Sequence, residues 1–329
     1  MAEPSGLPWG AGPAPSQPLL LKGWVHHWPV VQAARQSDAA LATYLQGFAT
    51  AQATPPVTLW RAPSSVLGRF FYNAAFDGFN FVAEHARLDQ VLAQLVAAAS
   101  QPQADALYVG STTVEAVWPG FRAHNDLAPS PEGALMSLWL GNRTRIAAHQ
   151  DVPDNLACVA AGRRRFTLFP PEQLPNLYVG PLDFTPAGQP ISLVDMALPD
   201  LERYPRFAQA QQAAQVFELE PGDALFIPSM WWHQVEALDS VNLLLNYWWS
   251  STPAFMAPPV AALLLAISSI RDLPAPQRQA WSAHFHHYVF AEPRPDHAHI
   301  PAQAQGLLGP LSPERTRPLR ARLLQLLNR

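Results

Sequence analysis

Between residues 102 and 249 the sequence alternates short apolar runs with clusters of turn-forming residues, and this pattern constrains the fold more than any other feature. Runs rich in Val, Leu, Phe, Tyr and Trp, such as LMSLWLG and VNLLLNYWW, are separated by Pro, Gly, Asp and Asn. This pattern is typical of antiparallel strands in a sandwich or barrel. We therefore expect a mainly β fold with added helices, built on an antiparallel sandwich or barrel over residues 101–250.

The segments on either side of the predicted barrel have other patterns. Residues 1–18 are mostly Pro, Gly, Ala and Ser, which predicts a flexible arm. Residues 19–100 predict a mixed α/β segment that packs on the barrel, with helices at 38–48 and 88–99. Residues 251–329 predict a helical C-terminal segment.

Composition excludes several classes of function. The 329 residues are only 14% charged, with 21 Lys and Arg against 25 Asp and Glu, so nothing favours binding to nucleic acid or to an anionic membrane. The single cysteine, Cys158, excludes internal disulfides and cysteine-based zinc sites, and its apolar neighbours predict a buried structural thiol. The longest apolar run, 260–270, is shorter than the roughly 20 residues of a spanning helix, and the composition of residues 1–18 does not predict a secretory signal. We expect a soluble, cytoplasmic protein.

A His-x-Asp pair among the eleven histidines predicts a metal site. On a strand, residues i and i+2 share a face, so such a pair plus a distant histidine forms the facial ligand set of non-haem Fe(II) oxygenases. Of two such pairs, His124 and Asp126 run into a turn-forming tract, and we attribute this pair to chance. His149 and Asp151 lie between strand-like runs and are the predicted ligands.

The third predicted ligand is His233, at the end of the spacing Gly222-x5-Pro228-x4-His233. The glycine allows a tight turn, a short strand follows, and the proline redirects the chain so that His233 opens the next strand. This spacing matches the second half of the cupin barrel motif. One position departs from that motif, because Ala237 stands where the pattern has asparagine.

Three protein ligands leave three octahedral positions for a bidentate 2-oxo acid and O2. A second carboxylate on that acid needs a cation deeper in the barrel. Alternation places Arg164 on one strand face with Phe166 and Leu168, where a charge is costly unless it meets an anion. We expect Arg164 to hold the co-substrate carboxylate bidentately, and Arg163 and Arg165 to be exposed. An ion pair between Arg164 and an internal Asp or Glu is the alternative.

These residues resemble the JmjC-type, cupin-8-like Fe(II)- and 2-oxoglutarate-dependent oxygenases, in particular the asparaginyl hydroxylases. The matching runs cover most of residues 106–249 in the same order: LYVGST, AAHQDVPDNLACVAAGRRRFTLFPPEQLPNLY, DLERYPRF and LEPGDALFIPSMWWHQVEALDSVNLLLNYWW. The resemblance implies a double-stranded β-helix (jelly-roll/cupin) barrel over residues 101–250 in which His149, Asp151 and His233 bind iron.

The resemblance also implies a set of co-substrate residues. Tyr108 would donate its hydroxyl to the 2-oxoglutarate tail, and Asn155 and Asn246 would line the pocket. Two positions depart from the family: Arg164 replaces a lysine, and Ile146 replaces the threonine of the asparaginyl hydroxylases. The first departure keeps the charge but changes length and geometry.

By resemblance, the expected function is hydroxylation of a C–H bond, with protein or peptide side chains as substrates, using Fe(II), 2-oxoglutarate and O2. A small-molecule hydroxylase, an N-methyl-lysine demethylase and a metal-binding cupin-like protein without 2-oxoglutarate turnover are the alternatives. The family also implies a homodimer formed by C-terminal helices, and the apolar stretch 258–270 would suit that contact.

Overall fold

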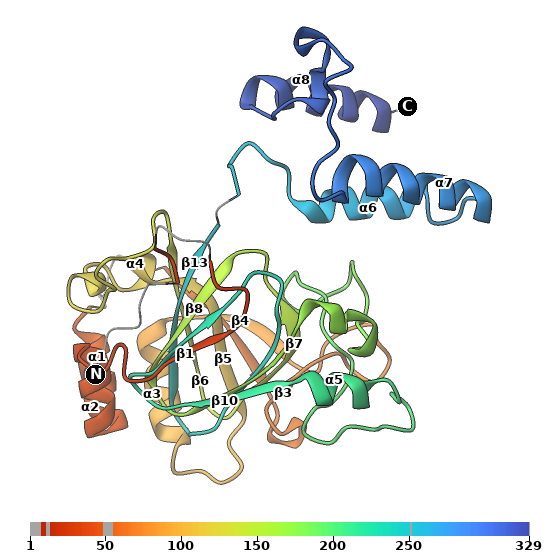
Figure 1. The fold of residues 1–329 in the computed structure, drawn as a ribbon. Coiled ribbons are helices and arrows are strands. Elements are labelled where there is room, and N and C mark those ends of the chain that lie inside the picture. Colours follow the sequence, from red (N-terminus) through yellow and green to blue (C-terminus); the bar gives the residue numbers. More distant parts are fainter. Residues whose placement is uncertain (1–7, 11–13, 49–54, 251, 329) are drawn as a thin grey trace. The chain divides into compact units, whose positions relative to one another are not determined.

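The protein is described here by a computed structural model that covers residues 8–10, 14–48, 55–250 and 252–328 (Figure 1). The chain divides into two compact units, Met1–Ser250 and Ser251–Arg329. The flexible arm predicted at residues 1–18 lies partly outside the described residues.

Unit 1 is built on two β-sheets that face each other, which confirms the predicted mainly β jelly-roll. The eight-stranded sheet has the order β1 (Leu19–Leu21), β11 (Ala224–Ile227), β8 (Asp154–Ala161), β13 (Asn242–Trp249), β6 (Leu135–Gly141), β5 (Ala106–Thr113), β2 (Val57–Ala62) and β4 (Val82–Ala86). The five-stranded sheet has the order β10 (Gln215–Leu219), β9 (Arg164–Phe169), β12 (Trp232–Ala237), β7 (Arg145–Gln150) and β3 (Arg69–Phe70). The pairing is antiparallel except between β3 and β7.

Helices cover the outer face of the eight-stranded sheet. They are α1 (Pro29–Gln36), α2 (Asp38–Gln46), α3 (Leu88–Ala98) and the short α4 (Val114–Val117). A further helix, α5 (Phe207–Ala213), lies in the chain between β9 and β10. The Ser37 hydroxyl accepts a hydrogen bond from the Ala40 amide and so caps α2. The predicted helices at 38–48 and 88–99 are confirmed, with each ending one or two residues early.

Alternation along β8 assigns its residues to two different cores. Leu156 and Cys158 face the helices in the larger core, whereas Ala157 and Val159 face the other sheet in a second core. Cys158 is a buried free thiol, as expected. The same parity turns Asn155 toward the space between the sheets, so a polar side chain enters an otherwise apolar interior.

The N-terminal segment supplies strands as well as helices. β1 pairs with β11 and β2 pairs with β5, so residues 19–100 extend the eight-stranded sheet. The described part of the predicted arm contacts unit 1: the Trp9 ring packs edge-on against Trp249 at 6.0 Å, and its indole N–H donates to the Pro129 carbonyl.

Unit 2 contains the predicted C-terminal helices, α6 (Pro259–Ser269), α7 (Ala275–Phe285) and α8 (Pro313–Leu327). α6 and α7 bury none of their described residues, and apolar side chains such as Val260, Leu263 and Leu264 are about half exposed. Within the described residues, none of the helices has the length and apolar character needed to cross a membrane.

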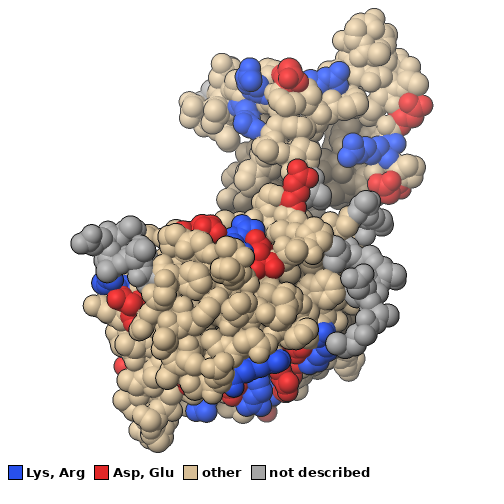
Figure 2. Space-filling model, turned by 90° about the vertical axis from the view of Figure 1, so that its left-hand side faces the viewer, with Lys and Arg blue, Asp and Glu red and all other residues tan. Residues whose placement is uncertain are grey.

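The surface of the protein is sparsely charged. Figure 2 shows blue and red groups next to one another on a mostly uncharged face. Arg163 pairs with Asp239, and Arg165 pairs with Glu218 and Glu236. These two arginines are therefore surface charges, as the strand parity predicts.

Candidate functional site

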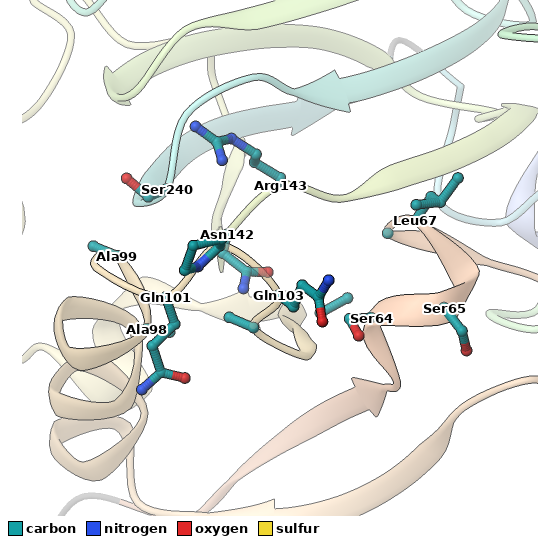
Figure 3. A pocket seen from close by; sticks show the side chains of 14 residues that line it. Ser64, Ser65, Leu67, Ala98, Ala99, Gln101, Gln103, Asn142, Arg143 and Ser240 are labelled. Atoms are coloured by element: carbon teal, nitrogen blue, oxygen red, sulfur yellow. The ribbon is translucent and has the colours of Figure 1, made fainter.

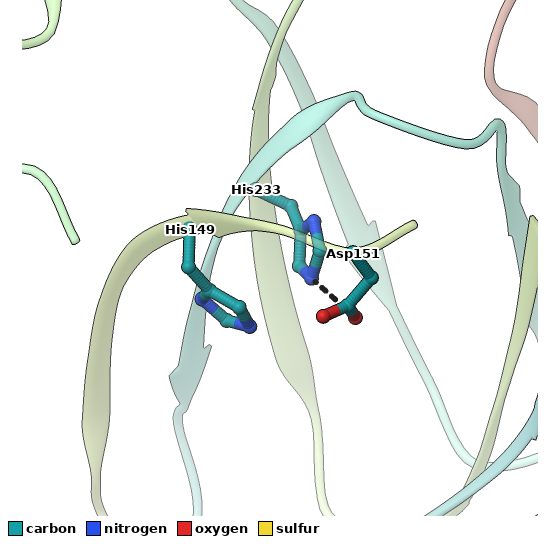
Figure 4. Close-up of side chains that lie close together, drawn as sticks. All are labelled: His149, Asp151 and His233. Atoms are coloured by element: carbon teal, nitrogen blue, oxygen red, sulfur yellow. Dashed lines mark ion pairs between the residues drawn. The ribbon is translucent and has the colours of Figure 1, made fainter. Parts of the chain in front are cut away.

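The structure brings the three predicted metal ligands close together (Figure 4). His149 on β7 and His233 on β12 are direct cross-strand partners, and their ring centroids are 4.3 Å apart. Asp151 follows the last residue of β7, and its Oδ2 lies 3.6 Å from His233 Nε2. One potential ligand atom from each residue lies within 4.8 Å of the others, so a single ion can contact all three.

Backbone hydrogen bonds fix the orientation of both histidine rings. His149 Nδ1 lies 2.9 Å from the Ala147 carbonyl oxygen, and His233 Nδ1 lies 3.0 Å from that of Trp231. A carbonyl oxygen only accepts, so each Nδ1 carries the proton and each Nε2 keeps its lone pair for a metal. Burial, followed by the neighbouring His149, lowers the pKa of His233 to about 4. His233 is therefore neutral at pH 7, as a metal ligand must be.

The Gly222 to His233 segment places its histidine by means of two turns. Gly222 has φ +104°, and a Cβ there would meet the His26 backbone at 3.0 Å, so the turn requires glycine. β11 follows and ends before Pro228, whose carbonyl accepts from the Trp231 amide at 3.2 Å. This second turn starts β12 and directs His233 inward.

The other His-x-Asp pair serves a structural purpose. His124 is exposed, whereas Asp126 pairs with Arg122 at 2.8 Å and accepts a hydrogen bond from the Tyr247 hydroxyl at 2.8 Å. The attribution of this pair to chance agrees with these contacts.

The predicted metal ligands and co-substrate residues all line one cavity between the sheets, which we call the inner chamber. Its lining residues are Tyr108, Trp139, Ile146, His149, Asp151, Asn155, Arg164, Phe166, His233, Val235, Leu244, Asn246 and Trp248. The metal ligands stand at β7 and β12, while Arg164 stands on β9 and the two asparagines on the opposite sheet.

Arg164 lies in this chamber without an acidic partner. It is 3% exposed, and one Nη donates to the Trp139 carbonyl at 3.2 Å while Nε has no partner. No Asp or Glu of the described residues lies within ion-pair distance, so the internal ion pair considered as an alternative does not form. Burial lowers the pKa of Arg164 to about 10, which leaves it charged at pH 7. A buried cation without an anion indicates an anionic ligand.

Neutral polar groups accompany the arginine. Asn246 Nδ2 donates to Asn155 Oδ1 at 2.7 Å, and Asn246 Oδ1 is buried without a partner. Burial raises the pKa of Tyr108, so its hydroxyl keeps its proton and can donate to a carboxylate. Arg164, Tyr108 and the asparagine pair are therefore hydrogen-bonding groups that suit a carboxylate.

A second cavity opens beside the metal ligands, and sequence reasoning did not identify it. This outer chamber has a volume of about 270 Å³ and shares Tyr108, Trp139, Ile146, His149 and Trp248 with the inner chamber. The rest of its wall is formed by Thr58, Trp60, Phe70, Gly110, Ser111, Ala147, Pro186, Ala187, Gln189 and Ile191. The strand parity of β6 and β13 could have identified Trp139 and Trp248, whereas no signal marks Gln189.

A further cavity of about 580 Å³ lies away from the metal ligands (Figure 3). Small and neutral side chains such as Ser64, Gln101, Gln103 and Asn142 surround it, and Arg143 is the charged residue of its lining. It shares no lining residue with either chamber, and without an acid or a histidine it offers no metal ligand.

Comparison with known proteins gives one family match and several partial relatives. Residues 13–255 match the family model described as a cupin-like domain. HSPB1-associated protein 1 of Homo sapiens is 37% identical over 122 residues, which are 36% of this chain and 24% of that protein. Lysine-specific demethylase JMJ31 of Arabidopsis thaliana is 35% identical over 117 residues, which are 35% of this chain and 21% of that protein. The tRNA wybutosine-synthesizing protein 5 of Gallus gallus is 39% identical over 106 residues, which are 32% of this chain and 30% of that protein. The chain spans less than a third of the length of these relatives.

Proposed function

This chain belongs to the cupin-like family, and from that premise we propose that it is an Fe(II)- and 2-oxoglutarate-dependent dioxygenase that hydroxylates a C–H bond of a protein or peptide side chain. The observation that carries the proposal is the inner chamber, which has a facial ligand triad at one end and a buried, unpaired Arg164 at the other. A metal site alone would not need that arginine.

His149, Asp151 and His233 would hold Fe(II) through the two Nε2 atoms and one carboxylate oxygen. With 2-oxoglutarate and O2, the bound iron supplies the oxidising power that turns a substrate C–H into C–OH. One oxygen atom of O2 enters the alcohol and the other enters succinate, while the co-substrate loses its 1-carboxylate as CO2.

The chain's own residues bind and orient the co-substrate. Arg164 would pair with the distal carboxylate, with two parallel N–H···O bonds available to its guanidinium. Tyr108 would donate to the same carboxylate, and the Asn155–Asn246 pair would line the path between that carboxylate and the metal. The aromatic and aliphatic remainder of the lining excludes water and strengthens these polar contacts.

The departures from the asparaginyl hydroxylases can compensate each other. Ile146 removes a hydroxyl donor from the chamber, whereas arginine at 164 adds donors relative to lysine. The proposal therefore keeps 2-oxoglutarate as co-substrate despite both changes.

The test is an aerobic incubation with Fe(II) and 2-oxoglutarate, followed by measurement of succinate and by an unbiased search for products in a treated lysate. The proposal predicts succinate and a +16 Da product with the wild type but not with Asp151→Ala. A loss of 14 Da would instead identify an N-methyl demethylase, and a +16 Da small molecule would identify a small-molecule hydroxylase. Metal binding without any succinate would leave only a cupin-like binding protein.

We also propose that the protein is a homodimer held by unit 2. The support is the apolar surface of α6, where Val260, Leu263 and Leu264 remain exposed within one chain. Light scattering on the purified protein should give twice the chain mass. Leu264→Glu should shift it toward the monomer, and a monomeric wild type would contradict the proposal.

A further inference from the structure

Histidines are concentrated in one short part of unit 2. Five of the eleven histidines of the chain lie within residues 284–299. None of these five belongs to the metal-ligand triad or to the lining of either chamber. The proposed dioxygenase function therefore does not use them.

Three of these histidines, His287, His297 and His299, have their rings in series, and we call them the histidine cluster. The centroid of the middle ring, that of His297, lies 6.4 Å from that of His287 and 6.2 Å from that of His299. The ring planes meet at 75° and 66°, so the rings do not stack. Their nitrogen-bearing edges can therefore turn toward a common point.

The histidine cluster joins two segments of the chain. His287 lies in the π-helical turn His286–Phe290, which directly follows α7. His297 and His299 lie in a second turn, in which the His297 carbonyl accepts from the Ile300 amide at 2.9 Å. Single π-helical turns are rare and occur frequently at functional sites.

The ring nitrogens of the histidine cluster are available to a ligand. Within the part of the chain that the structure describes, none of the three rings takes part in a hydrogen bond or an ion pair. His284 differs, because its Nδ1 lies 2.9 Å from the Ala280 carbonyl oxygen. His287 and His299 are exposed and His297 is half-buried. Exposed side chains change rotamer within nanoseconds, so these rings can rearrange around an ion.

The spacing of the rings is close to that of imidazoles that share one ion. With metal–nitrogen distances of about 2.0 to 2.1 Å, two imidazole rings on one ion have centres roughly 5 to 6 Å apart. The centroid distances in the histidine cluster are longer by roughly 1 Å, which a rotation of the side chains covers. Among the described residues, only the triad of unit 1 brings three ligand atoms within 4.8 Å, so the histidine cluster must contract slightly to bind an ion.

The donor atoms select the class of metal, and the construction of unit 2 gives the site a purpose. Imidazole nitrogen suits Zn²⁺, Cu²⁺ and Ni²⁺, whereas Mg²⁺ and Ca²⁺ prefer oxygen ligands. α6 and α7 bury none of their described residues, so packing contributes little to ordering the segments next to them. Small units with little core are commonly held by a structural metal ion.

We propose that His287, His297 and His299 form a second metal site, which binds a divalent transition ion such as Zn²⁺ and links the end of α7 to the turn that follows His297. The inference is independent of the dioxygenase proposal, because it uses no residue of the triad or of the two chambers.

The first arm of the test is a calorimetric titration of the full-length protein with Zn²⁺ alone. The starting protein is the double variant His149→Ala/Asp151→Ala, which removes two ligands of the triad so that binding in unit 2 is measured by itself. We expect one ion per chain, and a loss of affinity of at least about 10-fold when His287→Gln, His297→Gln or His299→Gln is added.

His286→Gln is the matched control for these substitutions. His286 lies in the same π-helical turn as His287, but among the described residues its ring contacts no member of the histidine cluster. Zinc affinity should therefore stay within about 2-fold of the starting protein. A starting protein that binds no zinc would overturn the inference. Equal losses in His286→Gln and His297→Gln would assign the binding to histidine-rich surface in general and would overturn it as well.

The second arm tests the link between the two segments. Chymotrypsin cleaves after exposed aromatic residues such as Tyr288 and Phe290, which lie in the π-helical turn. Zn²⁺ should slow cleavage there at least about 5-fold in the starting protein, and should not slow it when His297→Gln is added. Cleavage at an unchanged rate in the zinc-bound starting protein would overturn the linking part of the proposal.

Discussion

The two ends of the inner chamber are prepared for their ligands in different ways. At the metal end, both histidine rings and Asp151 already have hydrogen-bond partners that set their orientation. At the other end, Arg164 is buried with an unpartnered Nε and no acid nearby. The metal end is already organised, whereas the arginine end keeps a buried cation without a counter-ion.

This difference indicates which contribution each end makes. Preorganised side chains reduce the cost of ordering ligands around an ion, so under the proposed function the metal end would set the affinity for the metal. An unpaired buried cation destabilises the empty protein and favours an anion that reaches it, so under the proposed function the arginine end would bind the distal carboxylate of the co-substrate.

The largest effect is expected at the metal end. Asp151→Ala removes the carboxylate ligand and should abolish succinate formation, while circular dichroism shows an unchanged fold. His124→Ala removes an exposed histidine from the other His-x-Asp pair and is the matched control, with metal affinity and turnover expected at the wild-type level. An active Asp151→Ala enzyme would mean that the ligand set is wrong.

At the arginine end, Arg164→Met should weaken 2-oxoglutarate binding about 100-fold, because two charge-assisted hydrogen bonds contribute about 3 kcal/mol. Fe(II) affinity should change little, since the residue does not belong to the triad. Arg164→Lys keeps the charge and should lose about 10-fold. Calorimetric titration of each variant with metal and then with co-substrate measures both quantities, and equal losses in the two titrations would contradict the division of roles.

The preorganised metal end makes the metal-free protein sensitive to acid. His233 has a pKa of about 4 in the folded chain against about 6.5 when unfolded, so between these values the unfolded chain binds more protons. The contribution of neutral His233 to the free energy of unfolding is therefore fully present above about pH 6.5 and falls by about 3 kcal/mol as the pH drops toward 4. Urea unfolding at several pH values should show that the free energy of unfolding of the wild type falls as the pH is lowered through this range, and that it falls less in His233→Gln. The same pH dependence of the free energy of unfolding in both proteins would contradict the assignment of this acid sensitivity to His233.

The smallest effect is expected from Ile146→Thr, which restores the hydroxyl found in the asparaginyl hydroxylases. One added neutral hydrogen bond contributes about 0.5 to 1 kcal/mol, so 2-oxoglutarate should bind about threefold more tightly, with metal affinity unchanged. Binding that is 10-fold weaker would show that the Ile146 side chain itself packs against the co-substrate.

Both ends of the chamber were predictable from sequence, but by different signals. The metal ligands follow from the spacing of His149, Asp151 and His233, and Arg164 follows from strand parity among apolar neighbours, which its burial confirms. Tyr108, Asn155 and Asn246 came from family resemblance alone. Gln189 was not predictable, because it lies on a segment without regular structure whose course depends on contacts made by Phe184 with distant residues.

The most direct test of the central claim, that one chamber joins a metal site to a dicarboxylate site, is an anaerobic titration followed by visible absorption. Fe(II) and 2-oxoglutarate together should give a weak charge-transfer band in the wild type, and admission of O2 should remove the band and release succinate. Arg164→Met should need about 100-fold more 2-oxoglutarate to reach the same band. No band and no succinate in the wild type would contradict the account.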